Sequence, residues 1–507
     1  MSNNLIKINS RDNVAVVLRD IKENTELKIK NSTVNSTEDI PSGHKIALTD
    51  IKKGEPVIKY GAPIGRAVKS IKKGNWVHTH NLKTSLKGKK DYSYTETKKT
   101  ELKAGKNFAE DQVPVFTGYN REDGQVGIRN EIWIINTVGC ITRSSEKIAQ
   151  KASQKFSGLL KKENIAGIYD FPHPLGCSQL GDDLENTQKI LAGLTHHPNA
   201  AGVLVVGLGC ENNQIEDFKK VIGDYNSDRI KFIRLQDEKN EEKAALDKIK
   251  ELIDYASQFK KEEISVSRLK IGLKCGGSDS LSGITANPLL GRISDRIISY
   301  GGTSILGEVP EMFGAEEILL QRASSRKVFT DIANLINGFK EFFLDNDKEI
   351  YENPSPGNIE GGITTLEEKS LGNIEKGGSG LIRGVNKYGD RVKGPGLQLL
   401  ETPGNDLVST TALAAAGAHL VLFTTGRGTP FGGPVPTVKI STNSQLAELK
   451  ENWIDFNAGR LLKDISMEEL AQEFFQFLIQ IASGKKLTQN EINDFREIAI
   501  FKTGVTL

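Results

Sequence analysis

The sequence contains little cysteine and little histidine, no excess of either charge and no long apolar run. Only four of the 507 residues are cysteine, which is far too few for a disulfide scaffold. No apolar run approaches the roughly 18 residues that a membrane span needs, and residues 1–20 lack the apolar stretch and the cleavage site of a signal peptide. The sequence therefore predicts a cytoplasmic protein whose cysteines stay reduced, so that they serve in packing or bind a metal.

The charges are balanced and dispersed along the chain. There are 67 lysine and arginine residues and 65 aspartate and glutamate residues, which gives a formal net charge of +2. Because no block of like charge is present, the chain has no field that would hold a nucleic acid or a membrane surface. The expected partner is therefore a small molecule.

A chain of 507 residues is too long for one core, since a domain usually has about 100 to 200 residues. Residues 1–95 contain a weak internal repeat, in which a short β-rich run is followed by a turn. The three copies lie at 14–21, 46–54 and 67–74. Short strands separated by such turns predict a small β-rich module. Residues 96–112 are polar and have no apolar period, which predicts a linker.

From residue 113 onward, apolar runs alternate with amphipathic stretches. This alternation predicts parallel, doubly wound α/β domains over 113–265 and 266–507, of which the second is rich in glycine. Buried strands are expected at 132–138, 165–171, 203–206, 230–235, 269–273 and 419–424. Helices are expected at 145–161, 182–194, 240–260 and near 466–483.

The four cysteines share one context. Each follows an apolar run, and three of them come directly after a glycine. In an open parallel sheet the loops that leave the carboxyl ends of the strands meet at one edge, so distant residues can form one site there. Reduced thiolates select iron, zinc or an iron–sulfur cluster, whereas free cysteine is also a common small packing residue. A metal site and tight-turn packing are therefore both open for Cys140, Cys177, Cys210 and Cys275.

Three of the seven histidines lie in the N-terminal module, as His44, His78 and His80. In the string Trp76-Val77-His78-Thr79-His80, strand alternation places the last two imidazoles on one face. Two neighbouring imidazoles can move protons or bind a metal. The alternative is an exposed polar strand face.

Several glycine-rich loops carry a cation or a polar side chain. Backbone amides together with lysine or arginine suit a carboxylate or a polyol, because charge-assisted contacts fix its orientation. The candidate substrate-binding residues of this kind are Arg129, Asn130, Ser278, Asp279, Arg427 and Lys439. Each loop by itself is equally consistent with a turn that carries a solvated charge. The loop Gly207-Leu208-Gly209-Cys210 lacks the third glycine of a dinucleotide-binding loop, which argues against an NAD-dependent oxidoreductase.

Long, unusual strings occur nearly from end to end. The N-terminal ones are Gly43-His44-Lys45, Val57-Ile58-Lys59-Tyr60-Gly61 and His78-Thr79-His80-Asn81. Later ones are Gly127-Ile128-Arg129-Asn130, Cys275-Gly276-Gly277-Ser278-Asp279 and Glu368-Lys369-Ser370-Leu371-Gly372. Together they resemble the altronate and galactarate dehydratase family of sugar-acid lyases, with a SAF-like module at residues 1–95. The strings at 176–183 and 308–316 resemble the altronate branch more than the galactarate branch.

The resemblance implies an α/β multidomain enzyme, in which a small β-rich SAF-like module precedes doubly wound parallel domains. It implies loss of water from D-altronate to give 2-keto-3-deoxy-D-gluconate in hexuronate breakdown. It also implies a requirement for ferrous iron, as a single ion or in a cluster, and it leaves a homo-oligomer open. Galactarate dehydratase and a sulfolactate-type lyase are the alternatives within the family, and a non-catalytic sugar-acid binding protein is a remote one.

The chemistry of dehydration indicates a role for each group of candidate residues. Removal of the weakly acidic C2 proton needs a base within about 3 Å and an acid at the departing oxygen, while a metal can chelate the carboxylate and a hydroxyl. We expect the proton transfers from His44, His78, His80 and Lys45. The substrate carboxylate is expected at Lys45, Lys59 or Arg129, and the iron at the cysteines.

Overall fold

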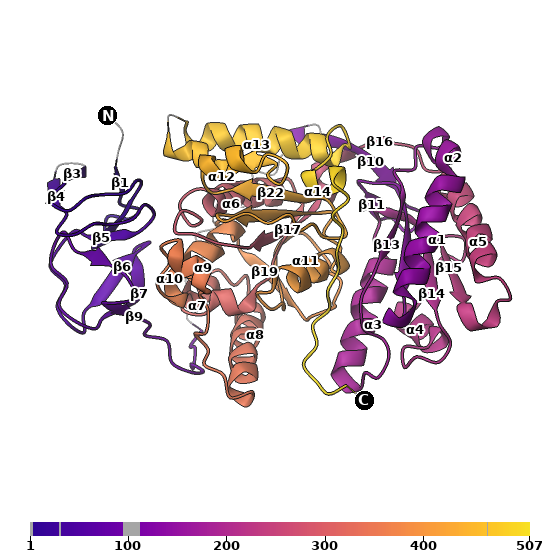
Figure 1. Cartoon of the computed structure of the whole chain (residues 1–507), viewed down its shortest axis with the longest axis horizontal. Coiled ribbons are helices and arrows are strands. Elements are labelled where there is room, and N and C mark those ends of the chain that lie inside the picture. The colour runs from indigo at the N-terminus through magenta and orange to yellow at the C-terminus, as the bar shows by residue number, and fades with distance from the viewer. Residues whose placement is uncertain (1–3, 30–31, 95–111, 464, 507) are drawn as a thin grey trace.

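The computed structural model describes residues 4–29, 32–94, 112–463 and 465–506. The chain forms three parts in a row, with the domain that ends the chain in the middle (Figure 1). The N-terminal module lies on one side of this central domain and the second domain on the other (Figure 1). The predicted linker at 96–112 falls, except for its last residue, outside the described residues.

The N-terminal module is made of short strands, as predicted. Its strands are β1 (Leu5–Ile6), β2 (Val14–Val17), β3 (Glu26–Ile29), β4 (Ser32–Asn35), β5 (Lys45–Ala47), β6 (Pro56–Lys59), β7 (Ala62–Ala67), β8 (Trp76–Val77) and β9 (Leu82–Lys83). They form sheets of order β1-β2-β5-β8 and β6-β7-β9 and the hairpin β3-β4. The turn after each repeat is held by an isolated bridge, Ile21 with Ile40 and Ile51 with Ile71, so the weak repeat corresponds to a repeated strand and turn.

The second domain has a four-stranded parallel sheet of order β13-β12-β14-β15. Its strands are β12 (Glu131–Asn136), β13 (Ile168–Phe171), β14 (Ala200–Gly207) and β15 (Ile230–Arg234). Its helices are α1 (Thr142–Lys155), α2 (Ser157–Lys162), α3 (Gly181–Thr195), α4 (Ile215–Ile222) and α5 (Glu241–Ala256). Apolar residues of α1 and α5 pack on one face, and those of α3 and α4 pack on the other. The predicted doubly wound arrangement is confirmed.

A small antiparallel sheet joins this domain to the next. It consists of β10 (Val115–Asn120), β11 (Val126–Gly127) and β16 (Glu262–Ser265), in the order β11-β10-β16. The segments that enter and leave the second domain therefore lie side by side.

The central domain has a seven-stranded parallel sheet of order β19-β20-β18-β17-β21-β22-β23. Its strands are β17 (Lys270–Cys275), β18 (Thr303–Leu306), β19 (Ile382–Asn386), β20 (Gly396–Leu400), β21 (Leu420–Thr425), β22 (Thr437–Ser441) and β23 (Phe456–Asn457). Its helices are α6 (Ala286–Ser299), α7 (Glu316–Gln321), α8 (Arg326–Asp345), α9 (Pro356–Glu360), α10 (Leu366–Ile374), α11 (Asp406–Ala415), α12 (Ser444–Leu449), α13 (Met467–Ala482) and α14 (Gln489–Ile492), with the 3₁₀ turn η5 (Val309–Met312). The mixed α/β multidomain fold is thus as predicted.

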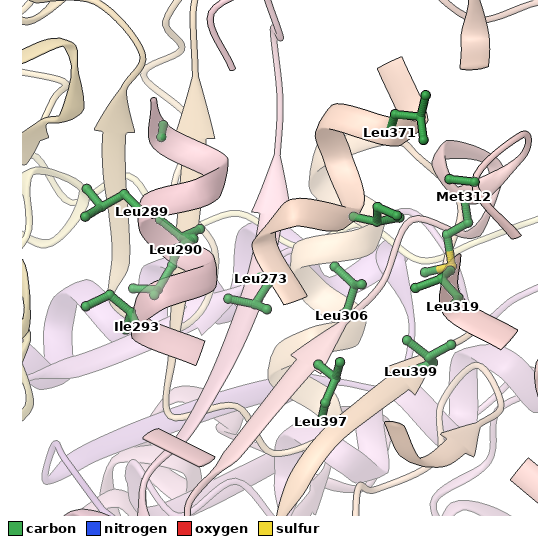
Figure 2. Close-up of a cluster of buried hydrophobic side chains, with 14 of the residues drawn as sticks. Leu273, Leu289, Leu290, Ile293, Leu306, Met312, Leu319, Leu371, Leu397 and Leu399 are labelled. Atoms are coloured by element: carbon green, nitrogen blue, oxygen red, sulfur yellow. The ribbon is translucent and has the colours of Figure 1, made fainter. Parts of the chain in front are cut away.

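The core of the central domain joins all three parts. Leu273, Leu306 and Leu397 of the sheet belong to one buried cluster with Leu290 of α6 and Leu371 of α10 (Figure 2). The same apolar cluster continues into buried residues of the N-terminal module. A second cluster combines α3 of the second domain with α11 of the central domain. Burial of apolar surface therefore stabilises both docked parts on the central domain.

The C-terminal segment crosses from the central domain to α3 (Figure 1). Phe501 N donates to the Tyr388 hydroxyl at 2.9 Å, and Thr503 N donates to Asp183 Oδ1 at 2.8 Å. In the described residues, no helix has the length and apolarity needed to cross a membrane.

Candidate active site

A buried carboxylate between two lysines connects the N-terminal module to the central domain. Lys45 begins β5, Lys59 ends β6, and Glu368 lies on α10. The Nζ atoms of Lys45 and Lys59 lie 2.9 and 2.8 Å from the two oxygens of Glu368, and all three side chains are buried. Lys45 Nζ also donates to Gly362 O and Thr364 Oγ1, each at 2.8 Å. The lysines predicted for the substrate are therefore bound to protein groups.

Opposing effects set the protonation of this cluster. Burial alone would raise the pKa of Glu368, but the two ammonium groups outweigh it and hold the pKa at about 2. Burial lowers the pKa of Lys45 to about 8, in spite of Glu368. Burial also works against the charge of Lys59, yet Glu368 keeps its pKa above the ordinary value. The carboxylate of Glu368 is thus the counter-ion of both lysines. Of the two, Lys45 loses its proton more easily.

Two of the predicted histidines lie beside this cluster. Trp76 Nε1 donates to His44 Nδ1 at 3.1 Å, so the proton of a neutral His44 is on Nε2, which lies 3.2 Å from Glu360 O. His78 Nδ1 lies 2.9 Å from Thr364 Oγ1, and the two imidazole centroids are 4.8 Å apart. Burial and the positive charge of Lys45 lower the pKa of both, that of His78 to about 3. Both imidazoles are therefore neutral at pH 7.

The prediction that His78 and His80 share a strand face is wrong. The strand β8 ends at Val77, because the Asn81 side chain accepts from His78 N at 2.9 Å and closes a turn. His78 is buried as a result, whereas His80 is exposed and lies against the Trp76 ring at 5.3 Å between centroids.

A cavity of about 570 Å³ lies at the carboxyl ends of central strands, where open α/β sheets bind their ligands. Phenylalanine and proline side chains form part of its wall. The polar residues in the wall are Cys275, Glu311, Glu352, Asn353, Ser355, Asn358, Lys369, Asn405 and Asp406. Such a mixture suits a small ligand with several hydroxyl groups and a charge.

Lys369 and Glu311 are the buried charged pair of this cavity. Lys369 Nζ lies 2.9 Å from Glu311 Oε1, and it donates to Asn353 Oδ1 at 2.9 Å and Asn358 Oδ1 at 3.1 Å. Asn358 Nδ2 in turn donates to Ser278 O at 2.8 Å. The cavity wall is therefore fixed by polar contacts between four separate segments of the chain.

The segment of residues 355–364 connects the cavity with the histidines. Its Ser355 and Asn358 line the cavity, while Glu360 O and Thr364 Oγ1 contact His44 and His78. The N-terminal module therefore contacts the cavity wall through this segment. Its histidines are not among the residues that line the cavity.

Three of the cysteines follow the strands of the second domain. Cys140 comes after β12, Cys177 after β13 and Cys210 after β14, and all three are exposed. Cys275 differs from them, because it ends β17 in the sheet of the central domain and is buried. Burial raises the pKa of its thiol, and its sulfur lies 2.7 Å from Ser278 Oγ. The expectation that Cys275 joins the other three is therefore not met.

The three loops that carry the exposed cysteines are bound to one another. Gly139 N donates to Leu175 O at 2.8 Å, and Asn213 N donates to Gly176 O at 3.0 Å. Asn213 Nδ2 also donates to Thr137 O at 3.0 Å. Gly176 has φ +97°, and a Cβ atom there would lie 1.9 Å from Thr137 O, so only glycine permits this approach. The carboxyl edge of the sheet is thus a rigid platform for these thiols.

Comparison with known proteins agrees with this architecture. Three family models match the chain: "Altronate/galactarate dehydratase SAF domain" at residues 3–85, "D-galactarate dehydratase/Altronate hydrolase, second domain" at 118–257 and "D-galactarate/Altronate dehydratase, C-terminal" at 266–506. The chain is 50% identical to the altronate dehydratase of Escherichia coli (strain K12) over 506 residues, with 99% of each chain covered. The chain belongs to the altronate and galactarate dehydratase family. It is therefore a hydro-lyase with a SAF domain.

Two further relatives show how identity varies within the family. The altronate dehydratase of Bacillus subtilis (strain 168) is 50% identical over 503 residues, with 99% of each chain covered. The galactarate dehydratase (L-threo-forming) of Escherichia coli is 31% identical over 498 residues, which are 95% of this chain and 93% of that protein.

Several residues that were predicted to bind the substrate instead contact other groups of the protein. Arg129 is buried and binds Glu491 at 2.7 and 3.0 Å. Asn130 accepts from Arg121 at 3.0 Å. Both line a separate cavity of about 510 Å³ at the second domain. Lys439 donates to two backbone carbonyls at 3.0 and 2.8 Å, and burial lowers its pKa to about 8. These contacts are structural ones, away from the cavity of 570 Å³.

The other three predicted residues do lie close to the site. Ser278 contacts Cys275, and the half-buried Asp279 has its carboxylate 2.8 Å from Thr442 Oγ1. Arg427 is partly exposed and binds Glu360 at 2.7 Å. They support the loops around the cavity.

Sequence reasoning did not select Glu311, Glu368 and Lys369. The sequence of α10 contained a signal for these residues. Its charged residues interrupt an apolar, glycine-rich stretch, and its apolar residues do not form a stripe on one side of the helix. All nine residues of α10 are buried. Buried charges need partners, so this helix indicates oppositely charged groups elsewhere in the chain.

Proposed function

We propose that this enzyme removes water from D-altronate and forms 2-keto-3-deoxy-D-gluconate. The observation that carries the proposal is the much higher identity over the full length to two altronate dehydratases than to a galactarate dehydratase. The string at 308–316, which resembles the altronate branch, contributes Pro310 and Glu311 to the cavity wall. The reaction would belong to hexuronate breakdown in the cytoplasm, and association of identical chains stays a prediction.

The cavity provides the chemistry that a sugar acid needs. Its volume of about 570 Å³ is in the range of small-molecule sites. The amide nitrogen of Asn353 can donate to hydroxyl and carboxylate oxygens. The positive charge of Lys369, whose three donors go to Glu311, Asn353 and Asn358, would attract a carboxylate into the cavity. These groups would orient the C2 hydrogen and the C3 hydroxyl for elimination.

Substrate choice is the direct test of this proposal. The iron-loaded enzyme should convert D-altronate with a kcat/KM at least about 100-fold higher than that for galactarate or sulfolactate, because misplaced hydroxyl partners are costly in a polar site. The measurement is the rate of 2-keto acid formation with each substrate. Equal rates would contradict the assignment to altronate, and a change in NADH absorbance would instead indicate an oxidoreductase.

We also propose that iron binds at Cys140, Cys177 and Cys210. Their thiols are exposed on loops that are bound to one another, and thiolates are a suitable donor set for iron. Across residues 4–29, 32–94, 112–463 and 465–506, no three His, Cys, Asp or Glu side chains are placed to hold a metal ion. An iron–sulfur cluster is larger than one ion and can bridge thiolates on separate loops. None of the three cysteines is among the residues that line the cavity of about 570 Å³. When bound, iron would supply a Lewis acid for oxygen atoms that reach the edge of the second domain's sheet.

The histidines of the N-terminal module are candidates for the proton transfer. His44 and His78 are neutral at pH 7, as a proton acceptor must be. If the histidines of the N-terminal module carry protons, His78→Ala and His80→Ala should each lower kcat by about 100-fold or more. If His78 only supports the segment 355–364, His78→Ala should lower kcat by a few fold and raise KM, and the exposed His80→Ala should have no effect. Steady-state kinetics of both variants distinguish these outcomes.

A further inference from the structure

We propose that Glu311 is the general base that takes the C2 proton of the sugar acid. The inference rests on the proposed dehydration, and it assigns a role to a residue in the cavity of about 570 Å³. It differs from the expectation that imidazoles perform this step.

One oxygen atom of the Glu311 carboxylate has no hydrogen-bond partner. Glu311 is 2% exposed and lines the cavity. Its Oε1 is bound by Lys369 at 2.9 Å, whereas its Oε2 is buried and has no hydrogen-bond partner. A buried carboxylate oxygen without a partner carries a large desolvation cost. A ligand hydroxyl group at Oε2 would relieve that cost by donating a hydrogen bond, and a weakly acidic C–H group there would relieve it by transferring its proton.

The surrounding residues fix the position of this carboxylate. Asn373 Nδ2 donates to the backbone oxygen of Glu311 at 3.3 Å. The preceding turn starts at Glu308, which has φ +66°, a left-handed conformation that is costly for a residue other than glycine. Glu308 is held there by Lys274 and by Lys376, whose Nζ lies 2.7 Å from Glu308 Oε2. Such positioning is what a general base requires.

The other acidic and thiol groups of the same cavity are less suited to act as the base. Asp406 is 34% exposed and lies 3.0 Å from Lys274 Nζ. Cys275 is buried, and its raised pKa keeps it a neutral thiol at pH 7. Glu352 is exposed to solvent. Of the carboxylates that line the cavity within the described residues, Glu311 combines burial with a free oxygen.

The step balances without any further reactant. The C2–H bond breaks, its proton goes to Glu311 Oε2, and its electron pair forms the C2=C3 double bond. The C3–O bond breaks, and the departing hydroxide takes a proton from solvent and leaves as water. The enol then loses its hydroxyl proton and gains one at C3, which gives the 2-keto acid. Glu311 returns its proton to solvent.

The test uses the full-length, iron-loaded enzyme and the isosteric variant Glu311→Gln. We expect kcat to fall by about 10²- to 10⁴-fold, with a Kd for D-altronate, measured by calorimetry, within a few fold of the unchanged enzyme. Formate should restore part of the rate of Glu311→Ala, because a small carboxylate can enter the vacated space. The matched control is Glu317→Gln, an exposed residue six positions later, which should keep the full rate.

Each outcome decides between the two proposals. If the unchanged enzyme does not convert D-altronate, the proposed function fails. If it does and Glu311→Gln keeps a near-normal kcat, Glu311 is not the base. If Glu311→Gln also loses affinity and formate restores nothing, Glu311 only positions the substrate, and the inference is overturned.

Discussion

Replacement of any two of Cys140, Cys177 and Cys210 by serine should abolish both iron binding and turnover of D-altronate. The three thiols lie at the ends of three neighbouring parallel strands, on loops whose backbones are bound to each other. Serine has nearly the same shape as cysteine but is a poor ligand for iron, which prefers thiolate in such sites. The loss should therefore appear without unfolding. Iron content per chain, the visible spectrum and the circular dichroism of anaerobically purified variants measure it.

Cys275→Ser is the matched control for iron. Because Cys275 lies in another sheet and is buried, this variant should keep its full iron content. Should the double variants at the three loops also retain iron and rate, the exposed cysteines are not ligands. The histidines of the N-terminal module would then be the leading candidates.

Glu368→Gln should lower the free energy of unfolding by about 3 to 5 kcal/mol, because it leaves two buried ammonium groups without their counter-charge. Lys45, Lys59 and Glu368 are all buried at the contact between the N-terminal module and the central domain. The amide still fits the space and can accept hydrogen bonds. The decrease in the free energy of unfolding therefore results from the missing charge and not from a change in side-chain volume. Denaturant unfolding at pH 7 measures it. The control is Glu360→Gln, which removes an exposed pair with Arg427 and should cost at most about 1 kcal/mol.

The same variant should change the response of stability to acid. The folded pKa of Glu368 is about 2, below its ordinary value of 4.5. A carboxyl group with a lowered pKa stabilises the fold above its ordinary pKa, and this contribution disappears as the pH falls through the folded pKa. The difference between the unchanged enzyme and Glu368→Gln should therefore be largest above pH 4.5 and shrink toward pH 2. A difference that is independent of pH would show that Glu368 is not ionised in the fold.

Much of the fold follows from patterns within short segments. The expected strand at 230–235 corresponds to β15, and the expected helix at 240–260 corresponds to α5, whose start is fixed by an Asn240 cap. The expected helix at 145–161 is divided into α1 and α2 around Phe156. Such elements depend on local periodicity and caps, which the sequence displays directly.

The site was less accessible from the sequence, because its contacts join distant segments. Local patterns place Cys275 after a strand, but they do not tell which of two parallel sheets that strand enters. Likewise Lys59 and Glu368 are 309 positions apart, and each alone resembles an ordinary surface charge. Arg129 lies two positions after Gly127, in a loop of the kind that binds ligands, yet its guanidinium binds Glu491. Pairing of buried charges is a property of the folded chain.

Carbon-13 NMR of D-altronate incubated with the anaerobically iron-loaded enzyme tests the central claim most directly. Loss of water converts two hydroxyl-bearing carbons into a ketone carbon at C2 and a methylene carbon at C3. We expect these two signals to replace those of D-altronate, and we expect Glu311→Gln to form them far more slowly. An unchanged spectrum with the fully iron-loaded enzyme, or a product that keeps all the oxygen atoms of the substrate, would contradict the account.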